Sequence, residues 1–418
     1  MAGLRIPKKK KMSINNKLTA YVKPNKVYIP LVDEDMNILT KKGEHVFKGQ
    51  VLAKRKNSFE TPVFSSVSGT IANIEEVSYQ NGKKVKALAI ENDYKEEIEK
   101  KYELRKNINK MDKQEFIDIL KECGIVGMGG AGFPTFMKYK TDQKIKTLLI
   151  NAVECEPYIT ADYTIIMEKI EEILETIDHI LSINGIEEAI IAIKECNTAL
   201  IEKVEKYLGT YLKIKVCPVR NIYPMGWERT LIKEVKNCTY DKLPIEKGII
   251  VNNVSTIYAI SQALKYNKPI IERIVTFTGE GLRKPQNVLV KLGTKVSDVI
   301  NNIGGTKDNI FYVSNGPMMG TLIDNDLVVT ADLNCVLVLE NKKDVITKEC
   351  LRCGKCANFC PANLCPVLIK DNINNPDKLK ELHPEKCISC GLCSYICPSK
   401  IDVREYIKKA KESVKGGK

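Results

Sequence analysis

Long hydrophobic runs are absent from this sequence of 418 residues. The longest purely apolar stretches are short ones such as Ile190–Ile193, whereas a transmembrane helix needs roughly 18 to 20 apolar residues. Residues 1–12 contain no apolar segment behind their lysines, as a secretory signal would require. We therefore expect neither a membrane-spanning segment nor a recognisable secretion signal. The length predicts about two to four domains.

Histidine is scarce as well, because the chain contains only His45, His179 and His383. None of them lies beside the glycine-rich or carboxylate-rich segments described below, so we expect no catalytic acid–base residue. Acidic residues are missing from residues 1–26, which hold eight Lys or Arg of a chain with net charge +13. The remainder is only mildly basic, which gives little support for nucleic acid binding. Residues 1–26 are predicted to form an exposed basic arm, either solvated or docked to an anionic membrane surface or an acidic partner.

Changes in sequence pattern divide the rest of the chain. Residues 27–92 alternate short β-type runs with glycine turns, which is typical of a small all-β domain. Residues 93–112 mix Lys, Glu and Tyr and are predicted to be a charged helical linker. Residues 113–270 alternate helices with short apolar strands, which predicts a mostly parallel sheet with flanking helices. Residues 271–340 return to β-rich sequence. The predicted fold class is multidomain, combining α/β and α+β domains.

Cysteine is concentrated at one end of the chain, since nine of the fifteen cysteines lie in residues 350–418. Eight of them form two identical runs, C-x2-C-x2-C-x3-C-P, which is the pattern of bacterial two-cluster ferredoxins. In that pattern the fourth cysteine of each run ligates the other cluster. A module over residues 345–418 is therefore predicted to bind two [4Fe–4S] clusters. The first takes Cys350, Cys353, Cys356 and Cys397, and the second takes Cys387, Cys390, Cys393 and Cys360.

Zinc sites or a disulfide scaffold are the alternatives for these cysteines. Zinc sites generally pair two C-x2-C units across a longer spacer and do not need the proline after the fourth cysteine, so the pattern favours iron–sulfur clusters. Clusters held by thiolates imply a reducing compartment, which places the chain on the cytoplasmic side. Cys365 lies outside the pattern and is expected to be a small buried apolar residue.

A glycine-rich segment, Gly127–Thr135, contains a formal G-x-G-x-x-G at Gly127, Gly129 and Gly132. A dinucleotide-binding fingerprint needs a strand before it and a helix at its end, whereas residues 113–123 read as a helix and Phe133-Pro134 interrupts the far side. The segment is therefore predicted to be a loop of another design, whose backbone N–H groups approach a flavin or a nucleotide phosphate. A mobile turn is the alternative.

Two further segments follow apolar strands. The strand at 146–150 leads into Asn151–Pro157, and the strand at 248–254 contains and precedes a pair of asparagines and Thr256. Ligands bind at the carboxyl ends of strands in open α/β sheets, and amides and carboxylates there suit sugar hydroxyls and ring N–H groups. Ordinary helix capping is the alternative for each segment.

Together these segments carry a resemblance. The loop GMGGAGFPTFMK (127–138), NAVECEP (151–157) and NNVST (252–256) resemble the flavin-carrying, NADH-oxidising subunit of complex I. The sequence is more similar still to the RnfC family of the Rnf electron-transport complex, through NAVECEPYITADY (151–163), YPMGWERTLI (223–232), ERIVTFTGE (272–280), SNGPMMG (314–320) and both cysteine runs. The resemblance covers about residues 27–407.

The resemblance implies a barrel-sandwich domain of biotinyl/lipoyl type at 27–92, an FMN- and NADH-binding α/β domain like that of the complex I flavoprotein at 113–270, a β-grasp domain at 271–340, and a ferredoxin-type helical module. No lysine stands at the tip of the barrel-sandwich hairpin, so no swinging arm is expected. The implied cofactor-binding residues are Gly127, Gly129, Gly130, Gly132, Phe133, Lys138, Asn151, Glu154, Glu156, Glu228, Asn252, Asn253 and Thr256. Among these, Phe133, Glu156 and Glu228 are expected on the NADH side.

The resulting hypothesis is an oxidoreductase that takes electrons from NADH through FMN to two [4Fe–4S] clusters and then to other redox subunits. We expect a cytoplasmic protein, with peripheral attachment to the cytoplasmic face of the membrane if the partners are Rnf-type membrane subunits. One alternative is a soluble electron donor to a cytoplasmic reductase of the proline-reductase-associated type. The other is an electron-wire subunit that has lost nucleotide binding.

Overall fold

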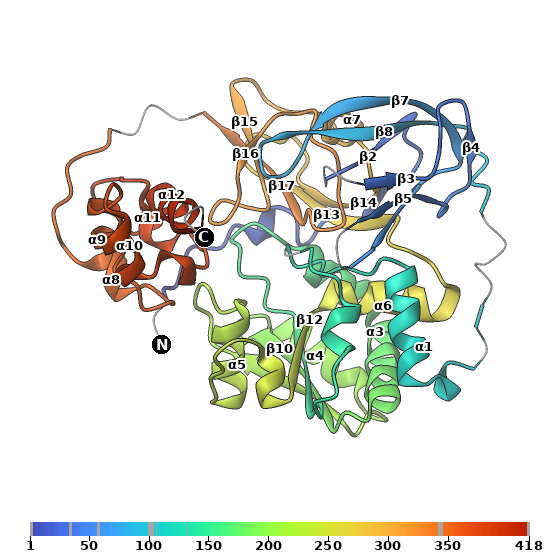
Figure 1. Ribbon diagram of the computed structural model, residues 1–418, viewed down its shortest axis with the longest axis horizontal. Coiled ribbons are helices and arrows are strands. Elements are labelled where there is room, and N and C mark those ends of the chain that lie inside the picture. The colour runs from blue at the N-terminus through green and yellow to red at the C-terminus, as the bar shows by residue number, and fades with distance from the viewer. Residues whose placement is uncertain are drawn as a thin grey trace.

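The computed structural model describes residues 3–32, 36–56, 59–98, 104–105, 107–130, 132–341 and 346–415. Figure 1 shows a helical module at one end of the molecule, an α/β domain below and two β-rich domains above. The predictions for Asp33–Asp35, for most of 99–106, for Ala131 and for 342–345 fall outside the described residues. Among the described residues, no helix is long and apolar enough to cross a membrane.

The first β domain forms because alternate residues of its strands face one core. In β2, Val27 and Ile29 are buried while their neighbours are partly exposed. One sheet has the order β2-β8-β7-β4 and the other β3-β5-β6. The strands are β2 (Lys26–Pro30), β3 (Met36–Ile38), β4 (His45–Val46), β5 (Val51–Arg55), β6 (Pro62–Phe64), β7 (Gly69–Ser78) and β8 (Lys84–Asn92). The hairpin tip at residues 65–68 is buried, and Ser66 Oγ donates a hydrogen bond of 2.6 Å to Leu292 O in the second β domain.

The α/β domain contains a fully parallel sheet in the order β11-β10-β9-β12, as the apolar strands predicted. The strands are β9 (Thr147–Asn151), β10 (Glu188–Lys194), β11 (Ile214–Val219) and β12 (Ile249–Asn253). The helices are α1 (Lys113–Glu122), α2 (Phe136–Tyr139), α3 (Ala161–Asn184), α4 (Thr198–Tyr207), α5 (Glu228–Lys236) and α6 (Val254–Tyr266), with short 3-10 turns η2 (Ile108–Lys110) and η3 (Pro244–Lys247). The apolar stripe of α3 lies in the main core, where α3 packs on α6.

The second β domain is a mixed sheet in the order β1-β14-β13-β17-β15-β16, with β13 and β17 parallel at its centre. Its strands are β13 (Glu272–Thr278), β14 (Gln286–Lys291), β15 (Ile310–Ser314), β16 (Leu322–Ile323) and β17 (Cys335–Glu340), and its helix is α7 (Val296–Asn302). Its first strand, β1 (Thr19–Tyr21), comes from the N-terminal segment and lies parallel to β14.

The prediction of an exposed basic arm is therefore wrong for residues 3–21. The backbones of Leu4 and Tyr223 exchange hydrogen bonds of 3.0 and 2.8 Å, the 3-10 turn η1 (Lys10–Met12) carries a buried Lys10, and β1 completes a sheet. The composition suggested an exposed arm because residues 1–26 hold eight Lys or Arg and no acidic residue. The apolar and hydroxyl residues between the basic ones find partners in other domains, which local composition does not reveal.

The prediction of a helical linker at 93–112 is also wrong for its described part, where η2 is the only helical turn. Tyr94 and Glu96 have φ values of 61° and 56°, in the left-handed region that an α-helix of L-residues does not use. Asp93 accepts hydrogen bonds from Ser68 Oγ and the Lys95 amide, which holds this segment against the first β domain.

The described residues of the C-terminal module, 346–415, contain helices and no strand, as the resemblance implied. Its elements are α8 (Lys355–Asn358), α9 (Pro366–Asp371), α10 (Pro376–Leu382), η4 (Pro384–Lys386), α11 (Leu392–Tyr395) and α12 (Val403–Lys415). Ile369, Leu379, Ile407 and Ala410 form its small core, against which several cysteines pack. So small a core suits a module that needs additional cross-links to be stable.

Candidate functional site

The neighbouring strands β9 and β12 bring two of the predicted segments together. Asn151 and Asn253, at the carboxyl ends of these parallel strands, are register partners. A cavity of about 470 Å³ lies at this edge of the sheet. Its volume is within the usual range for small-molecule and cofactor sites. Seven of the predicted binding residues line it: Gly129, Gly130, Asn151, Glu154, Glu156, Glu228 and Asn253.

The glycine-rich segment is a closed loop rather than a turn into a helix. The Gly127 amide donates to Phe133 O at 2.8 Å, and the Gly132 amide donates to Gly127 O at 3.1 Å. Gly130 lines the cavity with φ of +107°, a conformation that L side chains rarely adopt. The loop thus presents bare backbone to the cavity.

The other predicted residues do not line this cavity. Thr256 Oγ1 accepts a hydrogen bond of 2.9 Å from the Met128 amide and so anchors the glycine-rich loop. Lys138 Nζ donates to Val251 O at 2.6 Å, and the side chain of Asn252 donates to Tyr139 Oη at 2.6 Å, so these two contacts join helix α2 to strand β12. Burial lowers the pKa of Lys138. Phe133 is 42% exposed and meets Phe59 edge to face.

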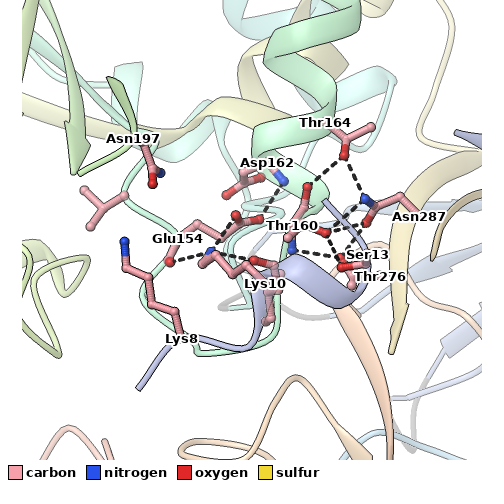
Figure 2. A network of polar contacts seen from close by, with 12 residues as sticks. Lys8, Lys10, Ser13, Glu154, Thr160, Asp162, Thr164, Asn197, Thr276 and Asn287 are labelled. Carbon is pink, nitrogen blue, oxygen red and sulfur yellow. Dashed lines mark hydrogen bonds and ion pairs between the residues drawn. The ribbon is translucent and has the colours of Figure 1, made fainter. Parts of the chain in front are cut away.

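Two carboxylates that line the cavity, those of Glu154 and Asp162, lie in one network of polar contacts (Figure 2). Glu154 Oε2 accepts a hydrogen bond of 2.8 Å from Lys10 Nζ, and Glu154 Oε1 accepts one of 2.8 Å from the Asp162 amide. The Asp162 carboxylate in turn accepts hydrogen bonds from Ser255 Oγ at 2.6 Å and Asn253 Nδ2 at 2.7 Å. Burial raises the pKa of Glu154, and the positive charge of Lys10 opposes this rise.

Glu156 faces the β-grasp side of the cavity. Its two oxygens accept hydrogen bonds of 3.1 and 2.9 Å from the amides of Met318 and Met319, and burial raises its pKa to about 7. Gly316, with φ of +100°, allows this approach, because a Cβ there would lie 2.6 Å from Glu156 Oε2. Glu228, in the first turn of α5, accepts a hydrogen bond of 2.6 Å from Tyr240 Oη.

Several lining residues were not among the residues predicted to bind FMN or NADH, although Cys390 was predicted as a cluster ligand. Asn315, Met319 and Asn334 come from the β-grasp domain, Tyr223 and Trp227 from the turn before α5, and Ile388 and Cys390 from the helical module. The Cys155 sulfur also lines the cavity and accepts a hydrogen bond of 2.6 Å from the Gly226 amide. Tyr223, Trp227, Asn315 and Met319 lie within the motifs that carried the resemblance, which was the available signal.

The eight cysteines of the two runs surround two cavities in the crossed arrangement that the spacing predicts. Cys350, Cys353, Cys356 and Cys397 line one cavity, and Cys360, Cys387, Cys390 and Cys393 line the other, whose wall Cys356 also touches. We call these cluster site one and cluster site two.

The spacing of the sulfur atoms bears on the choice of metal. Four sulfurs around one zinc ion would lie about 3.8 Å apart, from Zn–S distances of about 2.3 Å. Within the described residues, the one group of three potential ligand atoms all within 4.8 Å of one another is His45, Asp93 and Glu97, which contains no cysteine. No three cysteine sulfurs of the described residues are grouped as closely as one zinc ion would require, and the spacing of the two runs favours [4Fe–4S] clusters.

Family models match four parts of the chain. Residues 1–95 match the RnfC barrel sandwich hybrid domain, 120–262 the Nuo51 FMN-binding domain, 274–322 the SLBB domain and 349–401 the 4Fe-4S dicluster domain. Fold and site therefore define an electron-transfer flavo-iron–sulfur protein that carries FMN and two [4Fe–4S] clusters, an oxidoreductase that works within a complex.

Curated relatives identify the family. The RnfC protein of the proton-translocating ferredoxin:NAD(+) oxidoreductase complex of Clostridium ljungdahlii is 32% identical, over 88% of this chain and 82% of that protein. Its counterpart in the Na(+)-translocating complex of Acetobacterium woodii is 31% identical, over 88% and 86%. The counterpart in the ion-translocating oxidoreductase complex of Vibrio cholerae is 34% identical over 82% of this chain, which spans only 46% of that longer protein. The chain belongs to the RnfC family.

Solved structures show the same fold at lower identity. A chain of the NAD+-reducing [NiFe]-hydrogenase in its H2-reduced state aligns with a TM-score of 0.51 and 16% identity, over 74% of this chain and 61% of that one. The air-oxidised state gives a TM-score of 0.52 and 15% identity. This chain spans less than two thirds of those chains, and the likeness is one of fold.

Proposed function

We propose that this chain transfers electrons between NAD(H) and its two clusters, with FMN bound in the 470 Å³ cavity. The observation that carries the proposal is that one cavity is lined both by the glycine-rich loop, through Gly129 and Gly130, and by Cys390, a ligand of cluster site two. The relatives are named as ferredoxin:NAD(+) oxidoreductase subunits, which agrees with this assignment.

The residues around the cavity fit FMN. The bare backbone at Gly129 and Gly130 suits a phosphate or the edge of a ring, since N–H groups can approach closely there. The amides of Asn151, Asn253 and Asn334 suit hydroxyl groups and ring N–H groups. When bound, FMN supplies the exchange between two-electron and one-electron chemistry, and the protein contributes position and electrostatics.

The two cluster sites have different surroundings, and this difference supports an order in which electrons pass through them. Site two lies beside the flavin cavity, because Cys390 and Ile388 line both. Site one is built partly from Cys353, which is exposed. We assign site two as the cluster that exchanges electrons with the flavin and site one as the exit. Solvent exposure and hydrogen bonds to the sulfurs tune cluster potentials, so the two sites need not be equivalent.

We assign nicotinamide binding to residues that line the cavity or lie beside it. Glu156 and Glu228 line the cavity, and each already accepts hydrogen bonds within the protein. Phe133 lies outside the cavity lining and is partly exposed at the glycine-rich loop. We propose that Phe133 and Glu228 contact the nucleotide and that Glu156 mainly positions the loop at 316–320.

The surface around cluster site one suggests where the chain binds its partners. Beside exposed Cys353, Leu351 is 70% exposed and the side chain of Arg352 is 76% exposed. We propose that another redox subunit docks here, and that the chain lies on the cytoplasmic face of the membrane as a peripheral subunit of an Rnf-type complex. The relatives' names, which describe ion-translocating complexes, support this placement.

The deciding experiment is anaerobic purification of the full chain, extraction of its flavin, and addition of NADH while flavin and cluster absorbance are followed. We expect about one FMN per chain and bleaching of both chromophores. Absence of FMN together with no NADH-dependent bleaching would refute the proposal. Bleaching of the flavin alone would leave FMN in place but contradict the assigned contact with cluster site two.

A further inference from the structure

The N-terminal segment contacts several residues that line the cavity proposed for FMN. Leu4 and Ile6 pack with Tyr223 and Cys390 near cluster site two. Further along, Met12 packs against Tyr158 and Ile159, and β1 then joins the β-grasp sheet. The segment therefore touches the α/β domain, the β-grasp domain and the helical module in turn.

Within this segment, Lys10 is the residue whose ammonium group binds Glu154, a residue that lines the cavity (Figure 2). Lys10 is 6% exposed, and its ammonium group donates three hydrogen bonds: to Glu154 Oε2 at 2.8 Å, Glu154 O at 3.0 Å and Ile159 O at 2.5 Å. An ammonium group has three protons to donate, so its capacity is filled. Both Glu154 and Ile159 line the cavity.

The segment that Lys10 binds is conformationally demanding. Glu154 has φ of +47°, in the left-handed region that residues other than glycine rarely adopt. Such conformations persist where the surroundings hold them in place. Lys10 holds Glu154 in this conformation through two hydrogen bonds, one to its backbone carbonyl and one to its side-chain carboxylate.

A network of hydroxyl and amide side chains next to Lys10 holds the turn η1 in position. Ser13 Oγ and Thr160 Oγ1 lie 2.8 Å apart, and Thr160 Oγ1 also contacts Asn287 of β14 at 3.1 Å. Asn287 in turn donates to Thr164 Oγ1 of α3 at 2.8 Å. The turn η1 is thus pinned between α3 and the β-grasp sheet, and the four-lysine run places its third lysine at Glu154.

We propose that Lys10 is a positioning residue for FMN, which holds the Glu154 carboxylate and the turn at 154–159 in the shape that the flavin requires. This inference rests on the proposed FMN site. Since Lys10 does not line the cavity itself, it acts through Glu154 rather than by touching the cofactor.

The test uses the full chain with both clusters assembled and its flavin removed. FMN is then titrated in, and the dissociation constant is read from the quenching of flavin fluorescence. Lys10→Met removes the charge but keeps an unbranched stem, Lys10→Arg keeps the charge, and Lys11→Met is the matched control because Lys11 is exposed. A double-mutant cycle combines Lys10→Met with Glu154→Gln, because coupling between the two positions isolates their interaction.

We expect Lys10→Met to weaken FMN binding at least tenfold in the wild-type background and less than threefold in the Glu154→Gln background. Lys10→Arg should recover part of the loss, and Lys11→Met should bind like the wild type. Equal losses in both backgrounds would overturn the inference, because Lys10 would then act without the Glu154 carboxylate. Unchanged binding in Lys10→Met would overturn it as well.

Two further outcomes keep the test decisive. A wild-type chain that binds no FMN would refute the proposed function rather than the role of Lys10 alone. If Lys10→Met loses its clusters, the comparison moves to Glu154→Gln and Ser13→Ala, of which the second loosens the segment without touching Glu154. The inference then requires weaker FMN binding in Glu154→Gln than in Ser13→Ala, and the reverse order would overturn it.

Discussion

The hydroxyl group of Tyr223 donates a hydrogen bond of 2.6 Å to the carbonyl oxygen of Cys390. Tyr223 belongs to the turn before α5 in the α/β domain, and Cys390 is a predicted ligand of cluster site two. Both residues line the flavin cavity. This buried hydrogen bond therefore joins the wall of the cavity in which we place FMN to the backbone of a predicted cluster ligand.

Substituting Tyr223 by Phe removes this donor and leaves the buried carbonyl of Cys390 without it. An unsatisfied buried acceptor costs about 1–3 kcal/mol, so we expect a lower midpoint of chemical unfolding with unchanged FMN content. Rapid-mixing spectroscopy should show slower transfer from flavin to clusters. Tyr406→Phe, on the partly exposed helix α12, serves as control. Equal behaviour of the two variants would show that the contact at Cys390 has no role in stability or transfer.

Crossed ligation makes a separate prediction about the cysteines. Cys360 belongs to the first run but lines cluster site two, so Cys360→Ala should abolish the signal of the cluster held by Cys387, Cys390 and Cys393. Iron content should fall from about eight to about four atoms per chain, as expected for loss of one of two cubanes. Electron paramagnetic resonance of the reduced protein, compared with Cys387→Ala, measures this.

The matched control is Cys365→Ala, because Cys365 lies in the same module outside the ligand pattern. It should retain about eight iron atoms. Cys360→Ala and Cys350→Ala giving the same residual cluster signal would contradict the crossing and indicate that each run holds its own cluster.

The cluster sites and the parallel sheet could be predicted from the sequence because their determinants are local. Ligand spacing fixes which cysteines surround each site, and four apolar runs fix the strands β9 to β12. The placement of Asn151 beside Asn253 also followed, since parallel strands end at one edge.

The rest of the cavity depends on contacts between residues far apart in the chain. Asn334 reaches the cavity from the β-grasp domain without a local signal in the sequence. Cys390 reaches it from the helical module, and its cysteine run predicts a cluster ligand but not a place at this cavity. The run Lys8–Lys11 shows the same limit of prediction from local sequence. Nothing in four consecutive lysines tells that Lys10 is buried against Glu154 while Lys11 is exposed.

Arg404 joins the helical module to the loop at 318–320, whose amides bind Glu156. This contact leads to a prediction about how the helical module docks on the β-grasp domain. The Arg404 guanidinium donates hydrogen bonds of 2.9, 2.9 and 3.0 Å to the carbonyl oxygens of Met318, Met319 and Gly320. Hydrogen bonds from charged donors contribute about 1.5–3 kcal/mol each. Arg404→Ala should therefore leave both clusters intact but enlarge the radius of gyration in solution scattering and slow flavin-to-cluster transfer. Lys408→Ala, elsewhere on α12, should do neither, and a compact Arg404→Ala variant with normal transfer would refute the docking role.

Glu156 leads to a prediction about the pH dependence of stability. Burial raises its pKa to about 7 from an ordinary value of 4.5, while the amides of Met318 and Met319 and the charges of Arg404 and Lys10 act in the opposite direction. Above pH 4.5 the unfolded chain releases this proton, whereas the folded chain keeps it until about pH 7. The folded state binds more protons over this interval, so stability falls as pH rises through it.

The free energy involved is about 3 kcal/mol, at 1.36 kcal/mol for each pH unit between 4.5 and about 7. In Glu156→Gln this contribution vanishes, because the amide does not titrate. The variant loses one acceptor for the amides of Met318 and Met319, which costs about 1–3 kcal/mol at every pH. We therefore expect urea unfolding curves in which wild type loses stability relative to Glu156→Gln between pH 5 and 7.5. Glu91→Gln, at an exposed position, should follow wild type, and parallel pH profiles for wild type and Glu156→Gln would show that Glu156 does not titrate in this range.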